Sequence, residues 1–435
     1  MATCAQSETV SPCSGPLKGT LAMPGDKSIS HRALILGAMA EGLTEIRGLS
    51  DSLDVQSTIR CLEPWGVEIV TLKPGLHHVK SRGCHALKPQ ATEFDCGNSG
   101  TTLRLLMGLL ASRPFTSTLT GDASLQRRPM RRVANPLERM GARISLTRGD
   151  FAPLTISGGP LQGLEYELPV ASSQVKGALL LAGIQAEGIT RLTGRIDSRD
   201  HTERLLPHFG ATLRKGPGSV EVQGGQRLHA SLVQVPGDPS SAALWAAAAA
   251  LLPGSKVRIT GVSLNPTRTG FLEVLRRMGA RVVEEITDHD PEPIGHVTVI
   301  HQELRGVDIR PSEVPDLIDE LPLVAVLGSM ARGPTRVTGA GELRVKESDR
   351  IDAMVENLRA CGAHIHALED GFVIDGSDRL KGGVSVASHD DHRVAMAMAI
   401  CALGTEKPLR IDGASCTSIS YPEFFPQLHR MTGLS

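Results

Sequence analysis

Three short stretches of the sequence combine polar or basic side chains with the start of an apolar run, a pattern that could bind anions. The first, "MPGDKSISHR" (23–32), places a lysine, a serine, a histidine and an arginine within six positions. It is not the phosphate loop of nucleotide-binding proteins, because that loop needs a further glycine five residues before an adjacent Gly-Lys pair. Here an aspartate separates the glycine from the lysine. These side chains therefore suit an anion other than a nucleoside triphosphate.

The other two stretches are also typical of the beginnings of helices. "CGNSGTTLRLLMGLLA" (96–111) and "ASSQVKGALLLAG" (171–183) each start with small polar residues and continue as apolar runs. A helix N-terminus offers unpaired backbone N–H groups and a partial positive charge, which favour phosphate and carboxylate. A single serine or asparagine there is more often only a helix cap. Three such starts with added lysine, arginine and glutamine favour an anion site.

Further basic residues lie in four clusters: "SLQRRPMRR" (124–132), "DSRDHTER" (197–204), "ELRVKESDR" (342–350) and "SHDDHRVAMAMAI" (388–400). The first is predicted to be a loop, because its proline breaks helix geometry. In the third, Lys346 and Arg350 are four residues apart and would share one helical face if the segment is helical. In the fourth, Arg393 stands at the start of an apolar helix. Any one of these clusters alone is typical of a solvated charged surface.

Two segments contain residue types that bind metals, "DLIDE" (316–320) and "HDDH" (389–392). Neither has a matching set of ligands elsewhere in the sequence, and the arginine that follows the second would repel a cation. We therefore predict polar helix caps at both segments and no metal.

The composition limits the class of protein. The formal net charge of −1 argues against a general polyanion binder, and 3% of aromatic residues leaves few stacking surfaces for nucleic acid. The eight cysteines include no Cys-x-x-Cys pair, which favours a reduced protein over a disulfide framework or a zinc cluster. The longest apolar run, "AALWAAAAALL" (242–252), is too short to span a bilayer and is predicted to be a buried helix. With no secretory signal in the first residues, we expect a soluble cytoplasmic protein without nucleic-acid or membrane partners.

One phrase recurs along the chain: apolar residues, a glycine, and then an extended apolar segment. Its glycines are residues 66, 141, 210, 279 and 362, spaced by 75, 69, 69 and 83 residues, and a degenerate sixth copy is "LHRMTGLS" (428–435). At each copy a helix is expected to end on a left-handed glycine before a strand begins. A period of about 70 residues indicates duplication of one supersecondary unit, and six units would form two domains of three. The alternative is a chance run of glycine caps, which are common in α/β proteins.

The two halves share a Pro-Gly-Asp turn, in "LAMPGDKS" (21–28) and "VQVPGDPS" (233–240). Each stretch combines a short apolar strand, the turn and a serine that could cap the following helix. Their positions predict two hinges through which the chain crosses between domains.

The hinges, near 22–26 and 234–238, set the expected domain boundaries. A chain of 435 residues is too long for one ordinary core, which agrees with two domains. One domain would span 22–236, and the other would combine 1–21 with 237–435.

Several longer motifs indicate a family. "PGDKSISHRA", "GNSGTTLRLLMG", "GDASLQRRPM", "ASSQVKGALLLAG", "VPGDPSSAA", "ELRVKESDR" and "DHRVAMAMA" resemble, in the same order, the motifs of the 3-phosphoshikimate 1-carboxyvinyltransferases, or 5-enolpyruvylshikimate-3-phosphate (EPSP) synthases. The resemblance covers nearly the whole chain, from residue 15 to 428. The wording "DKSISHR", "SRDHTE" and "PEFF" is closer to the glyphosate-tolerant bacterial class of this family than to its plant-like class.

This resemblance implies an α/β enolpyruvyl transferase fold with two domains. Each domain would hold three βαβαββ repeats in an inside-out α/β barrel, with the substrate cleft between the domains and helix N-termini pointing into it. Both implied substrates, shikimate 3-phosphate and phosphoenolpyruvate, carry a carboxylate and a phosphate. A nearly neutral protein can bind them where its cations converge. We expect a monomer whose partners are these small molecules.

The resemblance also implies roles for the matching residues. Shikimate 3-phosphate would be bound by Lys27, Ser28, Arg32, Ser172, Ser173, Gln174, Arg199, Asp319 and Lys346. Phosphoenolpyruvate would be bound by Lys27, Asn98, Gly100, Thr101, Arg128, Gln174, Arg350 and Arg393. Asp319, Lys346 and Glu347 would lie at the reacting centre.

The implied reaction is an addition followed by an elimination. The 5-hydroxyl of shikimate 3-phosphate adds to C2 of phosphoenolpyruvate while C3 gains a proton, and the tetrahedral intermediate then expels inorganic phosphate. This chemistry needs a base, an acid and cations, but no cofactor. Asp319 is the expected base for the hydroxyl. Glu347 and Lys27 are expected to move the proton at C3, a role that such a coupled pair can share.

Two alternatives would have the same fold. The sister enzyme that acts on UDP-N-acetylglucosamine typically has a cysteine in the loop that here contains Ala123 and Ser124. A non-catalytic phosphometabolite sensor would keep the cations without needing Asp319 and Glu347.

Two positions bear on the phosphoenolpyruvate site. Ile419 stands where a lysine that contacts this substrate is common in the family, so another residue would have to supply that charge. Gly100 stands where many members of the tolerant class carry alanine. Because glycine leaves room beside the backbone, we expect this chain to bind glyphosate, the family's phosphonate inhibitor at the same site.

Overall fold

The computed structural model describes residues 6–89 and 91–433 and divides into two compact units. The inserted unit is the continuous stretch Gly25–Val235. The terminal unit combines the chain up to Pro24 with the chain from Pro236 onward. Within the described residues, no helix has both the length and the apolar character needed to cross a membrane.

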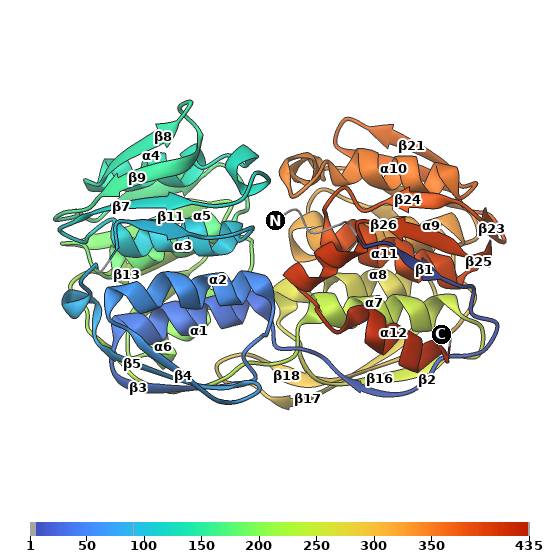
Figure 1. Ribbon diagram of the computed structural model, residues 1–435, viewed down its shortest axis with the longest axis horizontal. Coiled ribbons are helices and arrows are strands. Elements are labelled where there is room, and N and C mark those ends of the chain that lie inside the picture. The colour runs from blue at the N-terminus through green and yellow to red at the C-terminus, as the bar shows by residue number, and fades with distance from the viewer. Residues whose placement is uncertain (1–5, 90, 434–435) are drawn as a thin grey trace. The chain divides into compact units, whose positions relative to one another are not determined.

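The inserted unit alternates helices and strands along its whole length (blue to green in Figure 1). Its elements are α1 (Lys27–Met39), β3 (Ala40–Arg47), α2 (Leu53–Leu62), β4 (Glu68–Lys73), β5 (Leu76–Arg82), β6 (Glu93–Asp95), α3 (Gly100–Leu110), β7 (Thr116–Thr120), α4 (Arg131–Met140), β8 (Arg143–Thr147), β9 (Phe151–Ser157), β10 (Glu165–Leu168), α5 (Ser173–Gly183), β11 (Ile189–Gly194), α6 (His201–His208), β12 (Leu213–Gly216), β13 (Ser219–Gln223), β14 (Leu228–His229) and β15 (Leu232–Gln234).

The terminal unit begins with two strands from the start of the chain and continues after the inserted unit. Its elements are β1 (Glu8–Val10), β2 (Lys18–Ala22), α7 (Pro239–Leu251), β16 (Lys256–Ser263), α8 (Gly270–Arg277), β17 (Arg281–Asp288), β18 (Ile294–Ile300), β19 (Asp308–Ile309), α9 (Leu321–Ser329), β20 (Pro334–Val337), α10 (Arg350–Ala360), β21 (His364–Leu368), β22 (Gly371–Asp375), β23 (Leu380–Gly382), β24 (Ser385–Ala387), α11 (His392–Leu403), β25 (Thr405–Lys407), β26 (Leu409–Asp412) and α12 (Phe424–Thr432).

The sheets repeat one pattern, seen most simply in the order β6-β7-β9-β8. β6 and β7 are parallel and are connected through α3, whereas β9 pairs in the antiparallel direction with both β7 and β8. With α4 between β7 and β8, the order along the chain is βαβαββ. The sheets β10-β11-β13-β12 and β19-β20-β22-β21 have the same order and strand directions. The predicted α/β fold built from βαβαββ repeats is confirmed.

One sheet in each unit includes a strand that is remote in sequence from the strand it pairs with. β2 pairs in parallel with β16, Lys18 opposite Lys256, although the chain continues from β2 into α1 of the inserted unit. β15 pairs in parallel with β3, Leu232 opposite Glu45, although the next helix, α7, belongs to the terminal unit. The chain thus passes between units at the two Pro-Gly-Asp turns, and each passage completes a sheet.

The recurring glycines end helices as predicted. Glycines 66, 141, 210, 279 and 362 have φ values of 85, 120, 87, 108 and 97°, and the strands β4, β8, β12, β17 and β21 follow them. Such positive values suit glycine because it has no Cβ. Gly433 ends α12 with a φ of 66°, and the rest of the sixth copy lies outside the described residues.

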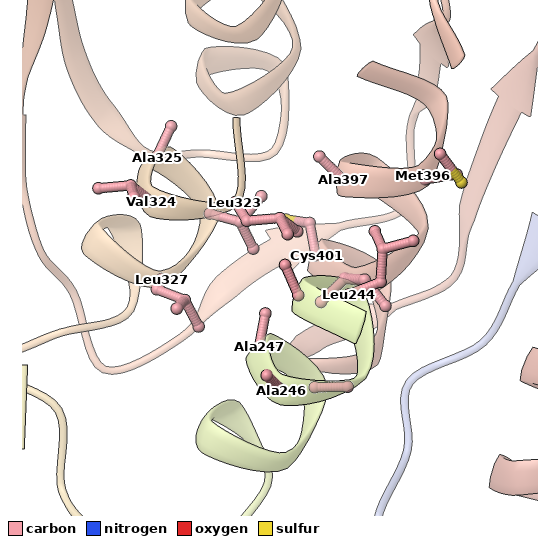
Figure 2. Close-up of a cluster of buried hydrophobic side chains, with 14 of the residues drawn as sticks. Leu244, Ala246, Ala247, Leu323, Val324, Ala325, Leu327, Met396, Ala397 and Cys401 are labelled. Carbon is pink, nitrogen blue, oxygen red and sulfur yellow. The ribbon is translucent and has the colours of Figure 1, made fainter. Parts of the chain in front are cut away.

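Small side chains allow the helices inside each unit to pack closely. In the inserted unit, α1, α2 and α3 lie between the sheet of β3 to β5 and that of β7 to β9 (Figure 1). In the terminal unit, Ala246 and Ala247 of α7 belong to the same buried hydrophobic cluster as Leu323 of α9 and Cys401 of α11 (Figure 2). The alanine-rich run predicted to be a buried helix is α7, and its residues 246–250 are at most 1% exposed.

The parallel helices α3 and α5 approach each other especially closely. A Cβ built on Gly108 of α3 would lie 2.2 Å from the carbonyl oxygen of Ala178 of α5, too close for any side chain. This contact needs a glycine, and it brings the two helix N-termini side by side.

Candidate active site

The first turn of α1 is capped by an aspartate. Asp26 Oδ1 accepts a hydrogen bond from Ile29 N at 2.8 Å, and at α7 Asp238 Oδ1 accepts from Ser240 N at 2.7 Å. The expectation that the serines of the two Pro-Gly-Asp turns would cap these helices is wrong. Each aspartate stands at the last residue before its helix, from which its side chain reaches the free N–H groups, whereas Ser28 and Ser240 already lie in the first turn.

The other two predicted helix starts are capped by serines. Ser99 Oγ accepts from Thr102 N at 3.1 Å at the start of α3, and Ser172 Oγ accepts from Val175 N at 3.4 Å at the start of α5. The remaining N–H groups of each first turn stay available to an anion.

Arg32 joins the starts of three helices. Its Nε donates to Thr202 Oγ1 of α6 at 2.7 Å, its Nη1 to Ser28 O at 2.9 Å, and its Nη2 to Ser173 O of α5 at 3.3 Å. The residue is only 3% exposed. Three residues predicted to bind shikimate 3-phosphate, namely Ser28, Arg32 and Ser173, are thereby brought together.

Gln174 joins the first turn of α5 to that of α3. Its Nε2 donates to Thr101 Oγ1 at 3.0 Å, and its Oε1 accepts from Arg104 Nη1 at 2.6 Å. Arg104 also donates to Pro129 O at 3.0 Å and is 5% exposed. Sequence reasoning missed Arg104, although a single charge within the apolar run "TTLRLLMG" was the signal that could have revealed it.

Arg128 holds the turn that precedes α3. Its Nη2 and Nη1 donate to Asn98 Oδ1 at 2.6 Å and to Asn98 O at 3.2 Å, and Asn98 in turn donates to Asp122 Oδ2 at 2.7 Å. The prediction that "SLQRRPMRR" forms a loop is only partly right. A single 3-10 turn, Leu125–Arg127, precedes Arg128, and α4 begins at Arg131. Pro129 does not prevent this helix, because it stands before the first helical residue, where no helix hydrogen bond requires its missing N–H.

Lys27 forms a largely buried ion pair in the same unit. Its Nζ lies 2.8 Å from Asp54 Oδ2 of α2, and the two side chains are 16% and 8% exposed. Asp54 carried no sequence signal, because it is 27 residues away along the chain.

His31 lies on the buried side of α1. Its Nδ1 is 2.7 Å from Thr58 Oγ1, and the ring is fully buried. Burial, together with the charges of Lys27 and Arg32, lowers the pKa of His31 well below its ordinary value of 6.5. His31 is therefore neutral and adds no charge to the cations around it.

The contacts of the inserted unit form one connected network. It runs from Ser28 through Arg32 to the start of α5, and through Gln174 and Thr101 to the turn held by Arg128. Arg199 lies in the segment between β11 and α6, directly before Asp200, the residue that precedes α6. Helix N-termini and cations concentrated in this way can bind phosphate and carboxylate groups.

In the terminal unit three carboxylates surround one guanidinium. Arg350 donates to Asp391 Oδ2 from Nε at 2.7 Å, to Asp319 Oδ1 from Nη1 at 3.1 Å, and to Glu347 Oε2 from Nη2 at 2.6 Å. The Arg350 side chain is 2% exposed. Burial alone would lower the pKa of Arg350, but the carboxylates of Asp391, Glu347 and Asp319 raise it above its ordinary value. The structure thus brings Asp319 and Glu347 together on a permanent cation.

Arg393 lies on the first turn of α11, as predicted, and faces a different carboxylate. Its Nη1 is 4.0 Å from Glu320 Oε1, which also accepts a short hydrogen bond from Ser240 Oγ. Arg268 Nη2 donates to the same hydroxyl at 2.9 Å. The neighbours Asp319 and Glu320 therefore serve different arginines.

Lys346 and Arg350 do not share a helical face. Lys346 ends a 3-10 helix, Gly341–Val345, and has a ψ of −149°, whereas Arg350 is the first residue of α10. Asp349 caps α10 through the N–H groups of residues 351 and 352, so the chain turns before the helix starts. Glu347 nevertheless remains beside Arg350 through their direct hydrogen bond.

Three acidic residues of the two metal-like segments accept hydrogen bonds within the protein. Asp319 and Asp391 accept from Arg350, and Glu320 accepts from Ser240. Asp391 also accepts from Arg393 N at 2.8 Å, which makes it the cap of α11, as predicted for "HDDH". Across the described ranges, no group of three or more histidine, cysteine or acidic side chains is arranged to hold a metal ion.

Known proteins match this chain over nearly its whole length. The family model described as EPSP synthase (3-phosphoshikimate 1-carboxyvinyltransferase) matches residues 13–428. A 3-phosphoshikimate 1-carboxyvinyltransferase of Bacillus licheniformis is 46% identical over 417 residues, covering 95% of this chain and 97% of the relative. The corresponding protein of Bacillus subtilis is 44% identical over 418 residues, covering 96% and 97%.

Solved structures agree as well. An EPSP synthase from Acinetobacter baumannii superposes with a TM-score of 0.87 at 40% identity, covering 99% of each chain. The enolpyruvyl transferase NikO from Streptomyces tendae superposes with a TM-score of 0.78 over 97% of each chain, but at 18% identity this likeness concerns the fold alone.

Proposed function

This chain belongs to the EPSP synthase family, the 3-phosphoshikimate 1-carboxyvinyltransferases, and we infer that it transfers the enolpyruvyl group of phosphoenolpyruvate to the 5-hydroxyl of shikimate 3-phosphate. The products are 5-enolpyruvylshikimate 3-phosphate and inorganic phosphate. The reaction belongs to the shikimate pathway, which leads to chorismate and the aromatic amino acids. It proceeds by addition to C2 of phosphoenolpyruvate and elimination of phosphate, and it needs no cofactor.

Shikimate 3-phosphate is assigned to the network around Arg32. Ser172 and Ser173 at the start of α5 would hold its phosphate, and Ser28 with Arg32 would bind its carboxylate side. The hydrogen bonds from Arg32 to Ser28 O and Ser173 O support this assignment, because they hold both groups around one buried cation. The remaining members assigned to this substrate are Lys27, Gln174, Arg199, Asp319 and Lys346.

Phosphoenolpyruvate is assigned to the start of α3 and to three arginines. Asn98, Gly100 and Thr101 would present backbone N–H groups, while Arg128, Arg350 and Arg393 would supply the positive charge, with Lys27 and Gln174 touching both substrates. The hydrogen bonds of Arg128 to Asn98 support this assignment, because they fix a cation beside the free end of α3.

Proton transfer is assigned to Asp319 and to Glu347 with Lys27. An ionised Asp319 can accept the proton of the 5-hydroxyl as its oxygen adds to C2. Glu347 and Lys27 then supply the proton at C3 and take it back during elimination. Arg350 supports these roles, because it fixes the carboxylates of Asp319 and Glu347 by direct hydrogen bonds.

One observation carries most weight: the two proposed acid–base residues, 28 positions apart in the sequence, meet on the same buried arginine. A binding protein would gain nothing from two carboxylates beside the site of an anionic ligand, since they would repel it. An enzyme needs them for proton transfer.

The test is a coupled assay of phosphate release from phosphoenolpyruvate. Release should require shikimate 3-phosphate and should not occur with UDP-N-acetylglucosamine. Arg350→Gln should abolish release, whereas Arg410→Gln, which removes an exposed ion pair with Asp412 at 3.0 Å in the same unit, should leave it unchanged. Release with the nucleotide sugar would contradict the assignment, as would substrate binding without any release.

We also propose that the enzyme acts as a monomer in the cytoplasm. The seven described cysteines are free thiols, which suits a reducing compartment. Sedimentation at micromolar concentration, where a monomer of 46.2 kDa is expected, tests the assembly state.

A further inference from the structure

A buried lysine on α5 takes no part in the reaction described above. Lys176 Nζ donates to the carbonyl oxygens of Ile196 at 2.8 Å and Ser198 at 2.9 Å, and it lies 2.7 Å from Glu203 Oε1. The Lys176 and Glu203 side chains are 2% and 5% exposed. An ammonium group has three N–H donors, so these three acceptors use all of them. None remains for a substrate.

The three acceptors frame the segment that carries Arg199. β11 ends at Gly194 and α6 begins at His201, so the residues between them lie outside helices and strands. Their backbone is held by Arg195 N on Leu168 O at 2.9 Å and by two short-range bonds, from Ile196 N to Gly194 O and from Ser198 N to Ile196 O. Lys176 binds this segment at two carbonyl groups, and the second belongs to the residue directly before Arg199. Through Glu203 it also holds the first turn of α6.

The buried carboxylate of Glu203 depends on Lys176 for charge compensation. Among residues 6–89 and 91–433, Glu203 Oε2 has no hydrogen-bond partner and is buried. Lys176 is therefore the cation that compensates this carboxylate, and removing it alone would leave a buried, unbalanced charge. The arrangement is rigid, since two backbone carbonyl groups and a helix are tied to one atom that is itself fixed on α5.

The same two helices carry the shikimate network. Thr202, next to Glu203, accepts from Arg32, and Ser173 and Gln174 lie within one turn of Lys176 on α5. We propose that Lys176 is a positioning residue that fixes the segment before Arg199 and so holds Arg199 in place for shikimate 3-phosphate. This inference rests on the proposed function, in which Arg199 contacts that substrate.

The test uses a variant that removes both charges, Lys176→Met with Glu203→Gln, so that no unbalanced carboxylate remains. Calorimetry in the absence of phosphoenolpyruvate should show a dissociation constant for shikimate 3-phosphate about tenfold higher than that of the wild type, as expected when a binding group is misplaced by a fraction of an ångström. Glu203→Gln alone should change it less than about twofold, because Lys176 keeps its bonds to both carbonyl groups. Arg195→Gln, which breaks the exposed Arg195–Asp197 pair in the same segment, is the matched control and should have no effect.

A double-mutant cycle with Arg199→Ala shows whether Lys176 affects shikimate 3-phosphate binding through Arg199. In that background the Lys176→Met, Glu203→Gln change should no longer weaken binding, because the group that it misplaces is absent. Additive effects would overturn the inference, as would an unchanged dissociation constant in a folded Lys176→Met, Glu203→Gln variant. If that variant does not fold, the Lys176→Gln, Glu203→Gln variant replaces it. The amide of Gln at position 176 can donate to one of the two carbonyl groups at most, so binding should still weaken, by about threefold or more, and an unchanged dissociation constant would overturn the inference.

Turnover of the wild-type protein distinguishes failure of the Lys176 inference from failure of the proposed function. If the wild-type protein forms product but Arg199→Ala binds shikimate 3-phosphate normally, the inference is overturned and the enzymatic function stands. If the wild-type protein releases no phosphate with shikimate 3-phosphate, the proposed function fails first, and the inference falls with it.

Discussion

Arg350 and Asp391, 41 residues apart in the sequence, form a bidentate ion pair in which Nε lies 2.7 Å from Oδ2 and Nη2 lies 3.3 Å from Oδ1. Their side chains are 2% and 0% exposed. Asp391 also accepts from Arg393 N at the start of α11. The Asp391 carboxylate therefore holds the guanidinium of Arg350 and also fixes the backbone of Arg393, another arginine assigned to phosphoenolpyruvate.

Asp391→Ala should weaken both the fold and phosphoenolpyruvate binding. It removes a buried ion pair and a helix cap together, so the free energy of unfolding should fall by about 3 kcal/mol or more, and the KM for phosphoenolpyruvate should rise. Urea unfolding and steady-state kinetics measure the two effects. Asp412→Ala, at the exposed pair with Arg410, is the control and should stay within about 0.5 kcal/mol of the wild type. Equal effects of the two changes would contradict the role given to Asp391.

Asp319→Asn tests the assigned base. The amide oxygen can still accept the hydrogen bond that Arg350 Nη1 now gives to Asp319 at 3.1 Å, so the geometry around Arg350 should be kept. Because an amide cannot take a proton from the 5-hydroxyl, kcat should fall about 100-fold or more, while binding of shikimate 3-phosphate stays nearly intact. Rapid-quench turnover and calorimetry give the two values. Turnover close to that of the wild type would remove Asp319 from the mechanism.

Gly100→Ala should separate glyphosate from phosphoenolpyruvate. A Cβ at this position would lie 3.0 Å from Arg104 Nη1 and 3.4 Å from Arg128 Nη1, so the new methyl group narrows the space beside both guanidinium groups. Because glyphosate is longer than the substrate, its inhibition constant should rise about tenfold or more relative to the KM for phosphoenolpyruvate. Gly159→Ala, where a Cβ meets nothing within 4 Å, is the control. An unchanged ratio of the two constants would contradict steric exclusion at Gly100.

Stability should fall on mild acidification because His31 is buried as the neutral form. Its pKa is lower in the folded state than the ordinary 6.5 of the unfolded chain, so the unfolded state takes up a proton first as the pH decreases. The contribution is complete above about pH 6.5 and is lost progressively below it. Burial also lowers the pKa of His77, which adds a loss of the same sign.

The measurement is the midpoint of urea unfolding as a function of pH, from about pH 7.5, above the ordinary histidine pKa, to about pH 5.5, below it. His31→Asn keeps a polar group near Thr58 but cannot be protonated, so its midpoint should decline less than that of the wild type. His78→Asn, at a partly exposed pair with Glu45, is the matched control. Parallel pH profiles for the wild type and His31→Asn would show that His31 does not titrate on unfolding.

Much of the fold follows from the sequence because the relevant forces act over a few residues. A glycine at the end of an apolar helical run adopts positive φ whatever surrounds it, and the recurring glycines did so. The long alanine-rich run is a buried helix because it has no polar face to present to water. Even so, local reasoning confused Ser28 with Asp26 as a cap, since two good capping residues stood two positions apart.

The contacts of the candidate site could not be predicted in this way, because they join residues that are distant along the chain. Motif order indicated candidate cations, but it did not indicate the groups that hold them, and it missed Arg104. Arg32 meets Thr202 across 170 positions, Arg104 meets Gln174 across 70, and Arg350 meets Asp391 across 41. Each of these partners is chosen by the packing of one helix against another, and a sequence read locally contains no record of that packing. The sequence alone thus determined the repeats, the helix starts and the family, whereas only the tertiary structure decided which carboxylate, hydroxyl or carbonyl fixes each cation.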